Sequence, residues 1–177
     1  MIRISPVYPD NEQALDFIER VYTESFPVDE RRDFDEVVRL LRENDDFAIA
    51  LLCDEDTPVG FISYWPWSDF TYMEHFAIDS CCRGAGYGAT AMTSLLHLLG
   101  KPAVLEVEKP DDELSRRRIR FYQRLGFVLS SRPYTQPPYS ADRQPLELRL
   151  MSYGAIDLDQ TFELVVTRIH NRVYGVE

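Results

Sequence analysis

The stretch that decides the fold runs from residue 74 to residue 88 and reads Glu-His-Phe-Ala-Ile-Asp-Ser-Cys-Cys-Arg-Gly-Ala-Gly-Tyr-Gly. Its first residues predict a strand, and its glycines stand just before residues with helical spacing of apolar side chains. Without Cβ atoms, the backbone of such a loop can turn several N–H groups toward one point, and the positive end of the following helix adds to them. With Arg83 at its mouth, the loop is a candidate cradle for a pyrophosphate.

The elements on either side of this stretch predict a mixed sheet. Gly100 ends the helix that begins near Tyr87, and a strand and a second helix follow it. The expected strands are 2–8, 47–53, 59–65, 72–78, 103–108, 127–130 and 146–151, and the expected helices end near 25, 43, 99, 125 and 174. The first half therefore consists of antiparallel hairpins, whereas the second half crosses over to a parallel neighbour.

The composition is that of one ordinary globular domain. The chain has 177 residues, of which 45% are hydrophobic and 28% are charged. Its 19 Lys and Arg against 30 Asp and Glu give a net charge of −11, which disfavours binding to nucleic acids and to anionic membrane surfaces. Three cysteines without framework spacing fit reduced thiols and no metal site. We expect a soluble, cytoplasmic protein.

One interpretation of the glycine loop is a dinucleotide site. Gly84, Gly86 and Ala89 satisfy the loose G-x-G-x-x-A pattern, and Glu106 lies near the distance at which a ribose-binding acid follows. This interpretation predicts an NAD-dependent oxidoreductase. However, residues 79–83 separate the loop from its strand, and a single crossover follows where a repeated βαβ fold is needed.

The loop has a second interpretation, because Arg83 to Gly88 reads R-x-x-G-x-G and resembles the acyl-CoA loop of the GNAT superfamily of N-acetyltransferases. Residues 74–79 resemble that family's fourth strand, and residues 121–127 resemble its F-Y-x-x-x-G-F segment. The resemblance covers residues 1–151, which we expect to form the acyltransferase domain. It implies an α/β fold of the α+β type, with helices on both faces of a mixed, mostly antiparallel sheet that splays in a V between its fourth and fifth strands.

The same resemblance implies an activity. A GNAT protein transfers the acetyl group of acetyl-CoA directly to a primary amine, here of a small molecule or peptide. The alternative is an acyl-CoA-binding domain without turnover. Residues 152–177 lie beyond the family's usual core and predict an amphipathic helical extension, which can cover the sheet or pair with a second copy in a homodimer.

Three residues are candidates for catalysis. The resemblance implies that Tyr122 points at the CoA sulfur, where it can give a proton to the leaving thiolate. Alternation predicts that Glu74 lies on one face of its strand with Tyr72, Phe76 and Ile78, which makes it the first candidate for the general base. Glu106 on the fifth strand is the second. The expected CoA-binding residues are Phe76, Ala77, Ile78, Arg83, Gly84, Ala85, Gly86, Tyr87, Gly88 and Ala89.

The resemblance also implies where the acceptor amine binds. In this fold the first two helices and the loop between the last strands form the acceptor site. Here they supply carboxylates beside aromatic side chains, a combination that suits a cationic amine. The candidates are Glu24, Asp29, Glu30, Arg31, Arg32, Trp65, Trp67, Tyr134, Gln136 and Tyr139.

Overall fold

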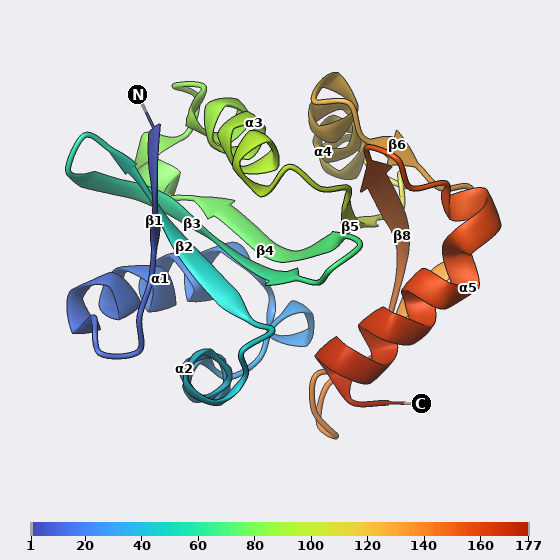
Figure 1. Ribbon diagram of the computed structural model, residues 1–177, viewed down its shortest axis with the longest axis horizontal. Coiled ribbons are helices and arrows are strands. Elements are labelled where there is room, and N and C mark those ends of the chain that lie inside the picture. The colour runs from blue at the N-terminus through green and yellow to red at the C-terminus, as the bar shows by residue number, and fades with distance from the viewer. Residues whose placement is uncertain (1, 177) are drawn as a thin grey trace.

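The computed structural model describes residues 2–176 and contains one sheet with helices on both faces (Figure 1). The strands are β1 Ile2–Pro6, β2 Ala48–Asp54, β3 Thr57–Pro66, β4 Thr71–Ile78, β5 Ala103–Glu108, β6 Val128–Leu129, β7 Tyr134–Gln136 and β8 Leu146–Tyr153. The helices are α1 Glu12–Ser25, α2 Phe34–Glu43, α3 Tyr87–Leu99, α4 Glu113–Arg124 and α5 Leu158–Ile169, with short turns η1 Val28–Glu30 and η2 Ser80–Cys82 and a π-helical turn η3 His170–Tyr174.

The sheet is mixed and mostly antiparallel, as predicted. Its strand order is β1-β2-β3-β4-β5-β8-β6, and β7 pairs with β8 beside β6. Only β4 and β5 run parallel, and they pair over just three positions, Thr71–Met73 against Ala103–Leu105. Beyond these positions the two strands are no longer paired. This is the splay expected between the fourth and fifth strands.

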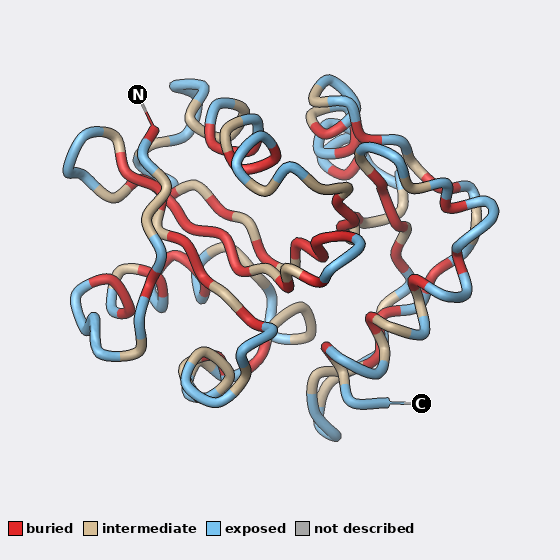
Figure 2. The backbone as a smooth tube through the Cα atoms, viewed as in Figure 1, coloured by how far each residue is buried: buried red, intermediate tan, exposed pale blue. Residues whose placement is uncertain are grey.

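Two separate cores lie on the two faces of the sheet. The α1/α2/α5 core contains Ile18, Val37 and Phe162, and the α3/α4 core contains Met92, Leu95 and Ile119. Figure 2 shows the buried backbone concentrated in the sheet strands between the helices, whose outer sides are exposed. Because α5 packs on the sheet of its own chain, the C-terminal segment covers the sheet in cis.

Several boundaries differ from the sequence prediction. β8 continues to Tyr153, so the expected division between residues 151 and 152 falls inside a strand. The final helix changes to a π-helical turn after Ile169, and a three-residue strand, β7, lies in the segment expected to be irregular. Within residues 2–176, no helix is long and apolar enough to cross a membrane.

Candidate active site

A cleft of about 490 Å³ opens where β4 and β5 separate. Both strands line it, together with residues of α1, η1, α4, β7 and β8. All three expected catalytic residues, Tyr122, Glu74 and Glu106, lie in its wall. The splay of the sheet therefore creates the space in which chemistry can occur, and both cores border it.

A β-bulge changes the face on which β4 presents its side chains. In the β3–β4 ladder, Ser63 pairs with His75 whereas Tyr64 pairs with Met73, so Glu74 is an extra residue. Tyr72 and Glu74 consequently contact the α1/α2/α5 side, while Phe76 and Ile78 pack on the α3/α4 core. The expectation that these four side chains share one face was wrong, because strict alternation does not survive a bulge.

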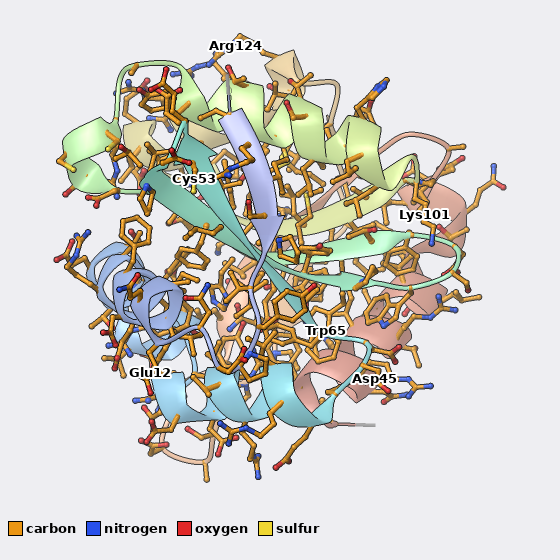
Figure 3. All side chains as sticks on the ribbon, turned by 60° about the vertical axis from the view of Figure 1, so that its left-hand side comes forward. Glu12, Asp45, Cys53, Trp65, Lys101 and Arg124 are labelled. Atoms are coloured by element: carbon orange, nitrogen blue, oxygen red, sulfur yellow. The ribbon has the colours of Figure 1, made fainter. Side chains whose placement is uncertain are left out.

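Glu74 is held in a buried ion pair. Its carboxylate bonds to the Arg32 guanidinium, accepts from Trp65 Nε1 at 2.7 Å and accepts from Tyr139 Oη at 2.9 Å. Trp65 itself lies between the sheet and α2 (Figure 3). Burial raises the pKa of Glu74, but the charge of Arg32, the neighbouring His75 and the hydrogen bonds from Trp65 and Arg32 together more than offset burial and leave the pKa lowered. A carboxylate so fully bonded is a weak base, and Arg32 also donates to Val173 O at 2.7 Å.

Glu106 has a different environment, made of tyrosines. Tyr134 Oη donates to it, and Tyr174 Oη lies 3.2 Å from Oε1 and 3.0 Å from Oε2. Within the described chain, no Lys, Arg or His forms an ion pair with this carboxylate. Burial raises the pKa of Glu106 to about 7, against the opposing hydrogen bonds of Tyr134, Tyr174 and Tyr72. Glu106 can therefore exchange a proton near neutral pH.

Tyr122 approaches the cleft from the opposite core. Its ring lies edge-on to those of Phe121 and Phe127, with centroids 5.1 and 5.5 Å away. Burial raises the pKa of Tyr122 to about 12, so the phenol stays protonated at neutral pH. Tyr122 lines the cleft. In the part of the chain that the structure describes, its hydroxyl has no hydrogen-bond partner. It is thus an available donor facing the cleft from α4.

The glycine loop connects β4 to α3 near the other end of the cleft. Gly84 and Gly86 have φ of 87° and 81°, a backbone conformation that other residues adopt only with strain. Tyr87 Oη donates to Asp54 at 2.8 Å and holds the start of α3 against β2. Arg83 Nε donates to Ile78 O at 3.0 Å, which keeps its guanidinium at the cleft wall.

Comparison with known proteins identifies the family. A family model described as the acetyltransferase (GNAT) family matches residues 7–127, which is more than half of the chain. The chain belongs to the GNAT family. It is accordingly an acyltransferase, and the dinucleotide interpretation of the loop loses its support.

Solved GNAT structures agree with this assignment. A GNAT-family protein from Bacteroides thetaiotaomicron is 38% identical, with a TM-score of 0.95 and 99% of both chains covered. Arabidopsis thaliana NAA60 in complex with acetyl-CoA is 15% identical, with a TM-score of 0.65 over 86% of this chain and 98% of that one. The ribosomal-protein-S18-alanine N-acetyltransferase from Escherichia coli is 19% identical, with a TM-score of 0.62 over 86% and 93% of the two chains. No curated protein sequence matches.

The residues of the GNAT loop fit the acetyl-CoA that this family uses. A Cβ added at Gly84 or Gly86 would meet no atom within 4 Å, so the loop is open on its outer side. The amides of Tyr87, Gly88 and Ala89 stand in the first turn of α3, where N–H groups lack intrahelical partners and the helix dipole is positive. Ala85 lies between the two glycines of the loop, Gly84 and Gly86. These groups next to Arg83 are candidates for holding phosphates.

The β4 backbone offers further hydrogen bonds along the cleft. Asp79 N donates to Val59 O of β3, so the alternate residues Phe76 and Ile78 direct their N–H groups away from β3, toward the splay. Ala77 lines the cleft but pairs with Phe61 in the β3–β4 ladder. Phe76 and Ile78 are therefore the two positions whose main chain can bond an extended arm.

The expected acceptor residues are only partly brought together. Glu24, Glu30, Gln136 and Tyr139 line the cleft, whereas Asp29, Arg31 and Trp67 do not. Arg32 and Trp65 do not line the cleft but donate hydrogen bonds to Glu74, which does. Tyr134 donates to Glu106 in the same way. Sequence reasoning missed Tyr174, which reaches Glu106 from the C-terminal π-helical turn. Its only signal was a tyrosine at the end of an amphipathic helix.

Proposed function

We propose that this protein transfers the acetyl group of acetyl-CoA to a primary amine, with Glu106 as the general base. The observation that carries the proposal is the carboxylate of Glu106, which has no cationic partner in the described chain, a pKa of about 7 and a place in the wall of the cleft that Tyr122 also lines. Glu74 is the weaker candidate, because Arg32 already neutralises it.

The first requirement of the reaction is a neutral amine. An alkyl ammonium with a pKa near ~10.4 is almost entirely protonated at neutral pH and cannot attack a carbonyl carbon. Above pH 7 Glu106 is mostly ionised, so it attracts the ammonium and then receives the proton that the nitrogen loses. When bound, acetyl-CoA supplies a thioester whose C–S bond breaks as the N–C bond of the product amide forms.

Tyr122 assists the leaving group as a hydrogen-bond donor. Its pKa of about 12 lies roughly 3.5 units above that of a thiol, near ~8.5, so complete transfer of its proton to the thiolate would cost about 5 kcal/mol. A hydrogen bond from the phenol stabilises the developing negative charge without that cost. After its attack the nitrogen loses a second proton to water, and the thiolate takes a proton from water after release.

The N–H groups of Phe76 and Ile78 supply the remaining stabilisation. They lie along the splayed part of β4, where no strand pairs with them. One can bond the carbonyl oxygen of the acetyl group as negative charge develops on it, and the other can hold the arm of the donor. Arg83 and the first turn of α3 would bind the phosphates at the far end.

The test measures the release of free CoA thiol from acetyl-CoA with a panel of primary amines, for the parent and for Glu106→Gln and Tyr122→Phe. We expect amine-dependent turnover that falls about 100-fold or more in Glu106→Gln and about 10-fold in Tyr122→Phe. Stabilisation of the fold by acetyl-CoA without turnover of any amine would instead support the acyl-CoA-binding alternative.

A further inference from the structure

Gln136 ends β7 with a buried amide that has no partner. The residue is only 3% exposed, and its Nε2 makes no hydrogen bond within residues 2–176. The side chain nevertheless lines the cleft. An amide N–H buried without an acceptor loses the hydrogen bonds that water gave it, so such groups are rare in folded proteins. The unpartnered donor indicates that a bound ligand supplies the missing acceptor.

Gln136 is placed to contact the acceptor rather than acetyl-CoA. It lies two residues after Tyr134, whose hydroxyl donates to Glu106. Side chains two positions apart on a strand point to the same face of the sheet, so Gln136 and Tyr134 share a face. The spacing puts Gln136 about 7 Å along the strand from that tyrosine. The glycine loop and Tyr122 belong to the side of the sheet covered by α3 and α4. A molecule whose amine meets Glu106 therefore extends toward Gln136 on the other side.

The charges around this half of the cleft exclude an acidic acceptor. Arg32 is saturated by Glu74 and by Val173 O, and Arg118 pairs with Glu108 at 2.6 Å. Arg83 lies at the glycine loop. Glu30 and Glu106 line the cleft and have no ion-pair partner among the described residues. A carboxylate on the acceptor would meet these two negative charges, whereas Arg83, which lines the cleft without an ion-pair partner in the described chain, is held at the glycine loop by its bonds to Ile78 O and Ser25 Oγ.

We propose that the acceptor is a primary amine that carries a neutral hydrogen-bond-accepting oxygen, such as an amide carbonyl or a hydroxyl, and no carboxylate. Gln136 is the residue that selects this oxygen, and Glu30 and Glu106 are the charges that favour the cation and repel an acid. The inference rests on the proposed acetyl transfer. It places amino amides, amino alcohols and peptide amines ahead of plain alkylamines and of amino acids.

The experiment compares ω-amino amides, alkylamines and ω-amino carboxylates of matched chain length as acceptors with acetyl-CoA. At the best chain length we expect kcat/KM for the amide to exceed that for the alkylamine about 10-fold, chiefly through KM, with the carboxylate poorest of the three. Gln136→Met keeps the length of the side chain and removes its polar atoms. It should reduce the amide-to-alkylamine ratio to about one.

Two further variants keep the result interpretable. Thr71→Val removes another buried, unpartnered polar atom, Thr71 Oγ1, which does not line the cleft, and it should leave the ratio unchanged. Gln136→Leu also removes the polar atoms of the side chain and should likewise abolish the amide preference, so a folding defect in Gln136→Met alone would not decide the matter. Equal rates for amide and alkylamine in the parent, an unchanged ratio in both Gln136 variants, or a preferred carboxylate would overturn the inference while acetyl transfer stands. No turnover of any amine would overturn the proposed function as well.

Discussion

Replacing Glu106 with Gln should make the protein less active and more stable above neutral pH. The pKa of Glu106 is about 7 in the folded protein, compared with 4.5 for an ordinary glutamate. The folded state thus holds this proton more tightly than the unfolded chain does. The stability it contributes is fully present below about pH 4.5 and is lost as the pH rises through about 7.

The structure sets the size of the effect. A difference of 2.5 pKa units, from 4.5 to about 7, corresponds to about 3 kcal/mol in the free energy of unfolding. Gln cannot ionise, so the variant does not lose this stability. We expect Glu106→Gln and the parent to differ little near pH 4.5, and the variant to be more stable by up to about 3 kcal/mol near pH 8.

Urea denaturation of both proteins across this pH range measures the difference directly. Other titrating groups, including the Glu74 ion pair, occur in both proteins and largely cancel in the comparison. Glu108→Gln is a matched control, because Glu108 lies on the same strand and its ion pair with Arg118 is partly exposed. That variant should shift stability by less than about 1 kcal/mol at any pH. A Glu106→Gln difference that does not grow with pH would refute the reasoning about burial, and unchanged turnover would refute the assignment of the base.

Further variants test the surrounding contacts. Tyr122→Phe should lower kcat with little change in the KM for acetyl-CoA, as steady-state kinetics would show. Tyr174→Phe removes a hydrogen bond that favours ionised Glu106, so the alkaline rise of kcat/KM should move to higher pH. Gly86→Ala, at φ 81°, should raise the KM for acetyl-CoA and cost about 1 kcal/mol in thermal unfolding. Arg32→Met should cost about 3–5 kcal/mol by leaving the Glu74 carboxylate unpaired, and adding Glu74→Gln should recover much of the loss.

Local patterns predicted the donor side of the molecule well. The glycine cluster, the helix Tyr87–Leu99 and the strand Ala103–Glu108 have the expected bounds, because turn glycines and apolar periodicity are local signals. The antiparallel pairing of β2, β3 and β4 and the parallel crossover from β4 to β5 were predicted, whereas the place of β8 between β5 and β6 was not. These features depend on residues close together in the sequence, and such residues determine which face of each element is buried.

The acceptor side could not be predicted in the same way. The bulge at Glu74 exists only in the register between β3 and β4, and alternation within β4 contains no sign of it. Arg32 and Glu74, which form an ion pair, are 42 positions apart in the sequence. Tyr174 and Glu106, which share a hydrogen bond, are 68 positions apart. Tyr174 is also the last residue of a π-helical turn, which rotates it relative to a continuous α-helix. Long-range pairing, rather than residue type, therefore decides which of the two glutamates is neutralised.

The net charge of −11 is misleading as a guide to ligands, because charges act over short distances at physiological salt, where the screening length is about 8 Å. At the glycine loop, Arg83 and the first turn of α3 present positive charge, so an acidic chain can still bind the phosphates of CoA. Across the splay, Glu30 and Glu106 have no ion-pair partners in the described part of the chain. The two sides of one cleft thus have opposite electrostatic preferences. An anionic donor beside Arg83 and a cationic acceptor beside Glu106 would each meet charge of the opposite sign.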